Sequence, residues 1–285
     1  MMRSPHAFTV AVRKGGKAGA EIALYKQELK PLGERFPLLK KKIIRGSAAL
    51  FEAMWLGMRA LNFSANEALA EENGNKEEIS GWALAGTMIL ALAFAVGLFL
   101  ALPLLLTSLL GMKFVAVAKN TVLFNLTDGA FRVALFLGYV SGISYMKDIR
   151  RVFEYHGAEH KAIAAFEAGV GLTVENARSY SRIHPRCGTS FLLTVVALSI
   201  LLFSLIPGSW PIWAKAASRL ALLPIIAGLG YEFIKYSANH CANPMVKTLM
   251  EPGLWLQRLT TREPSDDQIE VAIRAIEEAV AMEPR

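Results

Sequence analysis

The sequence is poor in charge: Asp, Glu, Lys and Arg make up 19% of its 285 residues, whereas 53% of the residues are hydrophobic. Soluble domains carry about a quarter charged residues, so this composition argues against an ordinary soluble fold. Charged residues are absent altogether from Ile79–Met112 and from Cys187–Ala214. Each run exceeds the roughly 20 apolar residues with which a helix crosses a bilayer. The sequence therefore predicts a membrane protein.

Cysteine is scarce as well, and so is any concentrated positive charge. Two cysteines, Cys187 and Cys241, cannot build a disulfide framework, which excludes a small secreted scaffold. The formal net charge of +7 is spread out, because residues 1–80 hold 13 Lys and Arg against 9 Asp and Glu, and residues 147–188 hold 7 against 5. Neither stretch is a solid basic stripe with interleaved aromatic residues. We therefore expect the lipid bilayer as the partner of these charges, and no nucleic acid.

Hydropathy predicts about four transmembrane helices and hence an all-α fold, a polytopic helical membrane protein with a helical metal-binding loop on its cytoplasmic side. The expected crossings are Trp82–Leu110, Val122–Tyr145, Thr189–Ile206 and Ala214–Tyr236. An N-terminal segment precedes them, the loop separates two transmembrane pairs, and a tail follows. The corresponding boundaries are 1–80, 81–146, 147–188, 189–237 and 238–285.

Two charged residues fall inside the second expected crossing. Asp128 and Arg132 are spaced i,i+4 and are therefore neighbours on one helical face. Charges at membrane depth are costly and face the protein interior or water. We interpret the two residues as an intramembrane ion pair that fixes helix packing, and a role in a polar cavity is the alternative.

Two amphipathic helices are expected outside the crossings. Apolar residues in Leu38–Leu61 fall mostly on one side, so this helix either lies on the membrane surface or packs on the protein's own core. Ser265 and Gln268 form the pattern of a capping box at the start of a tail helix. We expect the tail helix to dock on another cytoplasmic segment.

The central loop contains an H-x-x-E-H pattern formed by His156, Glu159 and His160. Residues four apart on a helix differ by about 40° in direction and about 6 Å in rise, so both imidazoles can bind one metal ion. Glu159 would then be within reach of a metal-activated water and could act as general base, as in the inverzincin metallopeptidases. The same pattern also occurs on helices whose His and Glu simply face water.

A second element, from His184 to Cys187, places an imidazole and a thiol at the short spacing typical of zinc ligands. Mixed imidazole and thiolate donors suit zinc or another divalent transition metal. We predict His156 and His160 as ligands, with Cys187 or His184 completing the set. If all four residues bind, the site is closed, which is typical of a structural zinc. A nucleophile pair of Cys187 with His184 is a further alternative.

Four more residues are candidates for the site. Glu175 is either an ordinary acid in the first turn of a short helix or an additional ligand. Glu232 lies near one end of the fourth expected crossing, where a polar role facing the loop is expected. Lys161 and Arg186 add positive charge around the loop and are predicted to contact an anionic group of the substrate.

Four stretches of this sequence, at residues 151–161, 172–176, 184–191 and 252–264, resemble the bacterial YqhQ-like membrane proteins. The resemblance covers most of the chain from about Gly46 onward. That family is described as metal-dependent enzymes with no settled substrate. The resemblance therefore implies a metal site and leaves the reaction open.

The flanks of the crossings predict the orientation, because Lys and Arg gather in cytoplasmic segments. They predict a multi-pass protein of the bacterial inner membrane with both termini and the 147–188 loop in the cytoplasm. The leading function is a zinc-dependent hydrolase, such as a peptidase, acting on a membrane protein or a lipid-linked substrate. The alternatives are a scaffold or assembly factor with a structural zinc, and a transporter built on Asp128, Arg132 and Glu232.

Overall fold

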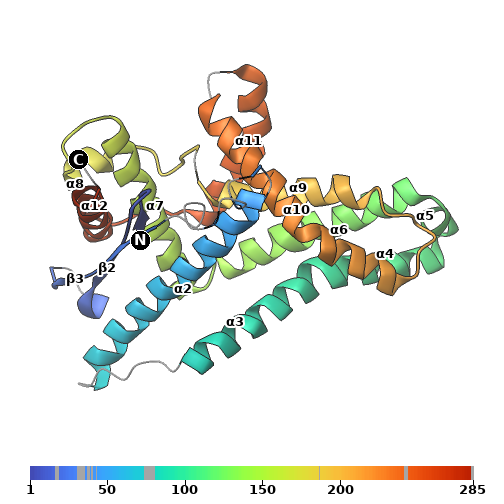
Figure 1. Ribbon diagram of the computed structural model, residues 1–285, viewed down its shortest axis with the longest axis horizontal. Helices are drawn as coiled ribbons and strands as arrows, with labels where there is room; N and C mark the ends of the chain where they lie inside the picture. The colour runs from blue at the N-terminus through green and yellow to red at the C-terminus, as the bar shows by residue number, and fades with distance from the viewer. Residues whose placement is uncertain are drawn as a thin grey trace.

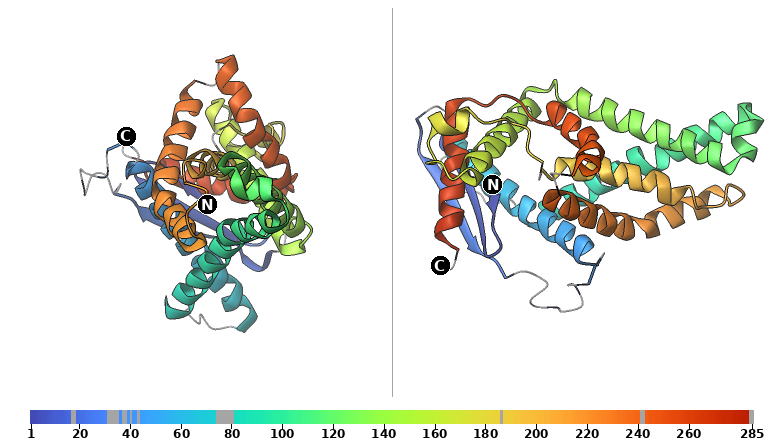
Figure 2. Two further views of the ribbon diagram at one scale, coloured as in Figure 1. Left: turned by 90° about the vertical axis from the view of Figure 1, so that its right-hand side faces the viewer. Right: turned by 90° about the horizontal axis from the view of Figure 1, so that it is seen from above.

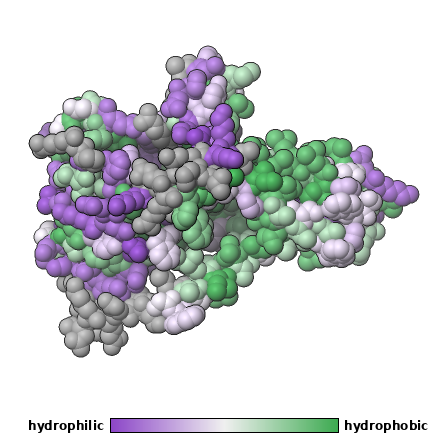
Figure 3. Space-filling view, in the orientation of Figure 1, coloured by the Kyte–Doolittle hydropathy of each residue, from purple (hydrophilic) through white to green (hydrophobic). Residues whose placement is uncertain are grey.

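Figure 1 shows the computed structural model, in which a bundle of helices extends from a part that contains both ends of the chain. Hydrophobic residues cover much of the bundle, whereas the opposite part of the molecule is largely hydrophilic (Figure 3). The structure describes residues 1–16, 19–30, 36, 39, 41–42, 44–73, 81–185, 187–240 and 243–283.

The N-terminal segment contains a small antiparallel sheet that the sequence did not lead us to expect. Its strands lie in the order β1 (Met2–Arg3), β2 (Ala7–Arg13) and β3 (Ile22–Glu28). Gly15, with φ of 60°, lies in the turn between β2 and β3. The prediction of an all-α fold is therefore wrong for this segment, although the chain is mostly helical.

One face of the sheet is covered by α2 (Ile44–Asn73). Phe8 and Val10 of β2 are buried there in one cluster with Leu56 and Ala60 of α2. This is not the apolar side on which the prediction rested, because Phe51, Trp55 and Leu61 are exposed. One face of the helix thus packs on the protein's own core, and a membrane-surface role for the exposed apolar face stays a prediction.

The other face of the sheet is covered by α12 (Asp266–Ala281). Thr9 of β2 donates a hydrogen bond of 2.7 Å from Oγ1 to the carbonyl of Ala275. The predicted capping box is present, because Ser265 and Gln268 exchange both of its hydrogen bonds. Since helices cover both faces of β2, the alternation of apolar and polar residues that marks a half-exposed strand is missing.

Among the described residues, three helical stretches are long and apolar enough to cross a membrane: Gly81–Lys113, Thr121–Ile143 (α6) and Ile212–Asn239 (α10). The first comprises α3 (Gly81–Val96), a wide helical turn (Gly97–Ala101) and α4 (Leu102–Lys113). The short helix α5 (Val115–Lys119) connects it to α6. The third predicted crossing, Thr189–Ile206, corresponds to α9 (Thr189–Phe203), which is apolar but shorter, with 15 residues.

The predicted ion pair lies buried inside the bundle. Asp128 of α6 accepts hydrogen bonds from Arg132 at 2.9 Å and from Arg219 of α10 at 2.7 Å. Arg132 also donates to the hydroxyl of Ser199 on α9 at 2.6 Å, and both arginines stack on the ring of Phe203. These contacts join α6, α9 and α10, which supports the packing role.

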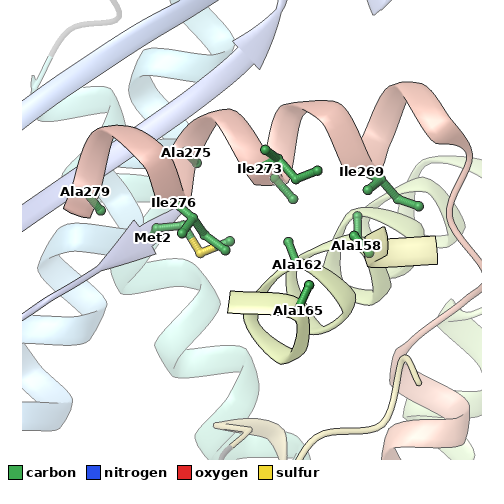
Figure 4. Packing of buried hydrophobic residues seen from close by; sticks show 11 residues of the cluster. Met2, Ala158, Ala162, Ala165, Ile269, Ile273, Ala275, Ile276 and Ala279 are labelled. Carbon is green, nitrogen blue, oxygen red and sulfur yellow. The ribbon is translucent and has the colours of Figure 1, made fainter. Parts of the chain in front are cut away.

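Three further helices lie outside these apolar stretches: α7 (Lys147–Glu167) and α8 (Val174–Arg178) between α6 and α9, and α11 (Pro244–Thr260) after α10. Seen from above, α7, α12 and the sheet gather at one end of the molecule, and the bundle extends from them (Figure 2). Small residues of α7 let it pack closely on the isoleucines of α12 (Figure 4), and the cluster includes Ala158, Ala162, Ala165, Ile269, Ile273 and Ile276. The tail helix therefore docks on the central loop's helix, as predicted.

Candidate metal centre

The two histidines of the H-x-x-E-H pattern lie side by side on α7. The ring centroids of His156 and His160 are 4.4 Å apart, as a spacing of four residues on a helix allows. Nδ1 of His156 lies 2.9 Å from the carbonyl oxygen of Thr260, and Nδ1 of His160 lies 2.6 Å from that of Arg182. A carbonyl oxygen only accepts, so Nδ1 donates in both rings. Nε2 of each ring is then available to bind a metal ion.

Cys187 supplies the third donor, from the turn that precedes α9. Its Sγ lies 3.2 Å from Nε2 of His156, and one donor atom from each of His156, His160 and Cys187 falls within 4.8 Å of the others. A tetrahedral zinc ion with ligand bonds of about 2.0–2.3 Å holds neighbouring donors about 3.3–3.7 Å apart. The three donors therefore fit zinc after a small contraction.

The electrostatics of the group favour an ionised thiol. Burial raises the pKa of the Cys187 thiol, but hydrogen bonds from His156 and His160 outweigh burial and lower this pKa from 9.0 to about 5. Burial likewise opposes protonation of His156, yet its hydrogen bond to Cys187 prevails and raises its pKa. Zinc binds the thiolate form of cysteine and the neutral form of histidine, so binding here would keep the thiolate and displace the Nε2 proton of His156.

The C-terminal end of α11 and the residues after it hold the group in place, a role that the sequence did not reveal. The buried side chain of Gln257 donates to the carbonyl of His184 at 2.9 Å and accepts from its N–H at 2.8 Å. The N–H of Arg262 donates to the carbonyl of Phe153 on α7 at 2.9 Å. A Cβ atom at Gly157 would lie 2.1 Å from the carbonyl oxygen of Arg262, so only glycine permits this approach.

Comparison with known proteins identifies the family. The family DUF1385, described as a protein of unknown function, matches residues 42–282. The chain is also 33% identical over 293 residues to the uncharacterized protein YqhQ of Bacillus subtilis (strain 168), and the match covers 99% of this chain and 90% of that protein. This chain belongs to the DUF1385 family. The YqhQ-like resemblance is thereby confirmed, and no solved structure matches the chain.

In this DUF1385 chain, His184 is not part of the three-donor group. Its Nε2 lies 3.2 Å from Oε2 of Glu167, and its ring centroid is 5.9 Å from that of His160. The histidines that contact Cys187 are His156 and His160. The structure therefore does not bring together the predicted pair of Cys187 with His184. The described donors also form a set of three ligands in place of the closed set of four.

The two additional acids lie elsewhere. Glu175 is exposed in the first turn of α8, two residues after the N-cap residue Thr173, so it has the ordinary role of a first-turn acid. Glu232 forms an ion pair with Arg45 at the start of α2 and thereby joins α2 to α10.

Of the two predicted anion contacts, the structure describes only Lys161. Lys161 is buried, and its ammonium group donates to the carbonyls of Arg178 and Tyr180 and pairs with Glu263 at 2.7 Å. These contacts account for its three N–H donors, so Lys161 fixes the loop after α7. Arg186 lies outside the described residues.

Glu159 and His156 both line an open cleft of about 1460 Å³. The other walls come from the sheet, α2, α3 and α12, and they are mainly apolar. The general base predicted from the sequence therefore lies on the same cleft as one of the two histidines.

Proposed function

We propose that this protein is a zinc-dependent hydrolase of the membrane surface, with His156, His160 and Cys187 as zinc ligands. The observation that carries the proposal is that His156, His160 and Cys187 bring one donor atom each into a single group. Nδ1 of each ring is bound to a carbonyl, which leaves Nε2 to face the thiol of Cys187, whose pKa is lowered. Catalytic zinc sites typically have three protein ligands and an open position, whereas structural sites have four. The orientation of His184 toward Glu167 supports the three-ligand form.

Zinc, when bound here, would supply a Lewis acid that polarises water or a substrate carbonyl or phosphoryl group. The carbonyls of Thr260 and Arg182 fix the ring orientation of His156 and His160, so the donor set is preorganised. Glu159 lines the adjoining cleft, where its carboxylate can take a proton from the attacking water and return it to the leaving group.

A second candidate is a cysteine hydrolase that works without metal. It is favoured by the contact of 3.2 Å between Cys187 Sγ and His156 Nε2 and by the lowered pKa of the thiol. The carbonyl of Thr260 orients the histidine, as a third group does in known nucleophile–base pairs. In this mechanism Cys187 attacks the substrate and His156 protonates the leaving group.

The proposal places the protein in the bacterial inner membrane with four crossings and the site in the cytoplasm. The Lys and Arg asymmetry supports this orientation. A fourth crossing by α9 is supported by a contact at the far end of the bundle, where the N–H of Gly208 donates to Thr121 Oγ1 at 3.3 Å. That contact puts the end of α9 beside the start of α6.

Metal analysis of protein purified without chelator tests the zinc assignment. We expect about one zinc per chain in the wild type and less than a tenth of that in His160→Ala and Cys187→Ala. His184→Ala is the matched control and should keep its zinc. Zinc lost equally from His184→Ala would indicate a closed structural site and favour the scaffold. If the wild-type protein contains no zinc, the zinc-dependent mechanism is contradicted and the cysteine hydrolase becomes the favoured candidate.

The base is tested separately with Glu159→Gln. This variant should keep zinc and fold but lose activity by orders of magnitude. Because the substrate is unidentified, activity is read in cells, by comparing the lipids and membrane proteins of deletion and Glu159→Gln strains with those of the wild type. We expect one uncleaved species to accumulate in both strains. Loss of zinc from Glu159→Gln would make Glu159 a ligand and contradict its role as base.

A further inference from the structure

The open cleft beside the zinc ligands is larger than an ordinary metabolite site. Its volume is about 1460 Å³, whereas pockets for small molecules measure roughly 300–1,000 Å³. Its walls belong to the sheet, α2, α3, α7 and α12, and Thr189 at the start of α9 lines it as well, so it lies where the bundle meets the sheet. A ligand that fills it must be long and must tolerate mainly apolar walls.

One wall of the cleft belongs to a helix that is apolar enough to cross the membrane. Met88, Ile89 and Leu92 of α3 line the cleft, and Ile89 and Leu92 are 71% and 59% exposed. Met54 and Leu61 of α2 line the facing wall and are also exposed. Since α3 begins the first membrane stretch, the cleft is continuous with the hydrocarbon region around that helix.

The walls that α2 and α3 contribute suit a hydrocarbon chain better than an extended peptide. Both walls are helical, so their backbone N–H and C=O groups are bonded within the helices. An extended peptide placed between them would leave its own backbone groups without partners, at a cost of several kcal/mol per group. An acyl chain has no such groups.

A smaller basic pocket adjoins the cleft and shares Arg13, Arg151 and Tyr155 with it. Lys147, Arg150 and Arg151 of α7 line this pocket. Glu154 and Asp267 line the pocket as well, and Arg13 is paired with Glu270 and Arg150 with Glu154. The four basic residues outnumber these two acids, so the pocket keeps an excess of positive charge. Because α7 begins only four positions after α6 ends at Ile143, these residues lie at the edge of the membrane segment. Phosphate headgroups occupy that level of a bilayer.

We propose that the site binds an anionic membrane lipid, with an acyl chain between α2 and α3 and the headgroup at Lys147, Arg150 and Arg151. The claim that this lipid is the substrate rests on the proposed hydrolase. The binding of the lipid in the cleft, here called the lipid seat, requires neither zinc nor catalysis. The lipid backbone between chain and headgroup would then pass His156 and Glu159. Hydrolysis of an ester there consumes one water and releases an acid and an alcohol, with no other reactant.

Photolabelling in nanodiscs tests the lipid seat. The probes are phosphatidylglycerol and phosphatidylcholine that carry a diazirine in one acyl chain, and mass spectrometry locates the labelled residues. In the wild type we expect phosphatidylglycerol to label Met54, Met88 and Leu92, at several times the yield of phosphatidylcholine. Labelling confined to the outward surfaces of α6 and α10 would overturn the proposal.

A substitution that fills the cleft gives the decisive comparison. Gly57 of α2 lines the cleft, and a Cβ placed there meets no atom within 4 Å, so Gly57→Trp can enter the cleft without a backbone clash. Gly86→Trp is the matched control, since Gly86 of α3 is equally open but does not line the cleft. Gly57→Trp should lower cleft labelling at least fivefold, and Gly86→Trp should leave it unchanged. Equal labelling in both variants would refute the lipid seat.

The headgroup is tested with the double variant Arg150→Gln/Arg151→Gln, which should bring the labelling yields of the two lipids to within a factor of two. A preference for phosphatidylglycerol that persists in this variant would contradict the headgroup assignment.

The same measurements separate this inference from the zinc proposal. Labelling that is sensitive to Gly57→Trp, in protein that holds no zinc and cleaves nothing, would sustain the lipid seat and refute the hydrolase. Protein that binds zinc but shows no labelling of the cleft by the lipid probe would support the metal site and contradict the lipid seat. A transmembrane peptide that carries the same diazirine and labels the cleft in place of the lipid would assign the site to a protein substrate.

Discussion

Cys187 is a buried thiol whose charged form is stabilised by its neighbours. Burial raises its pKa, but hydrogen bonds from His156 and His160 prevail and lower it to about 5. In protein freed of metal by a chelator, we therefore expect the thiolate to persist at neutral pH and to disappear as the pH falls through about 5. The difference in absorbance at 240 nm between wild type and Cys187→Ser measures this titration. A midpoint near the ordinary value of 9.0 would contradict it.

Asp128 is the buried acid that balances two arginines inside the bundle. Arg132 and Arg219 both donate to its carboxylate. Asp128→Asn removes that charge and leaves two buried cations uncompensated, which should destabilise the fold by about 3–5 kcal/mol. Thermal unfolding in detergent measures the loss. Asp148→Asn, at an exposed acid in the first turn of α7, is the control and should cost at most about 1 kcal/mol. If Asp128→Asn and Asp148→Asn destabilise the fold equally, the packing role of Asp128 is contradicted.

At the level of single residues, the sequence predicts whatever depends on helix geometry alone. His156 and His160 face the same side because they are four residues apart on α7. The choice between His184 and Cys187 depends on contacts distant in sequence, because Gln257, 73 residues further on, binds both backbone groups of His184. No local pattern marks Gln257 for that role, although it lies in a stretch that resembles the YqhQ-like family.

At the level of elements, close contact between α7 and the segment that ends α11 and follows it determines the orientation of His156. A Cβ at Gly157 would meet the carbonyl oxygen of Arg262 at 2.1 Å. Gly157→Ala should push this segment away and displace the Thr260 carbonyl that holds His156, at a cost of about 1–3 kcal/mol. Thermal unfolding and zinc content measure the two effects. Gly138→Ala is the control, since a Cβ at Gly138 of α6 meets nothing within 4 Å. A Gly157→Ala protein as stable and zinc-loaded as this control would contradict the prediction.

Elements with a strong local signal were predictable, and those defined by tertiary burial were not. The stretches matching α6, α10 and α12 follow from hydropathy or from a capping box. The strand β2 was missed because α2 and α12 bury both of its faces. The sheet is thus recognisable only once the helices that cover it are in place.

At the level of the whole molecule, the connections from α4 to α6 and from α9 to α10 lie at the end of the bundle away from the site (Figure 1). Gly208, after α9, is bonded to Thr121 at the start of α6. The helix α9 spans only about 22 Å, against about 30 Å for the hydrocarbon core of a bilayer. If α6 crosses the membrane, α9 must bring the chain across it as well, and the residues after Phe203 complete the distance.

Single cysteines in a background of Cys187→Ser and Cys241→Ser test this topology with an impermeant thiol reagent. Lys119→Cys and Ser209→Cys report on the two distant connections, and Val170→Cys reports on the loop that carries the site. All three positions are exposed in the structure. We expect labelling at 119 and 209 in intact cells, and at 170 only after permeabilisation, because Lys and Arg favour the cytoplasmic side. Labelling of intact cells at 170 alone would show that the protein has the orientation opposite to the predicted one. Labelling at 119 without 209 would show that α9 does not cross, and since Gly208 touches Thr121, it would contradict the packing of the bundle as well.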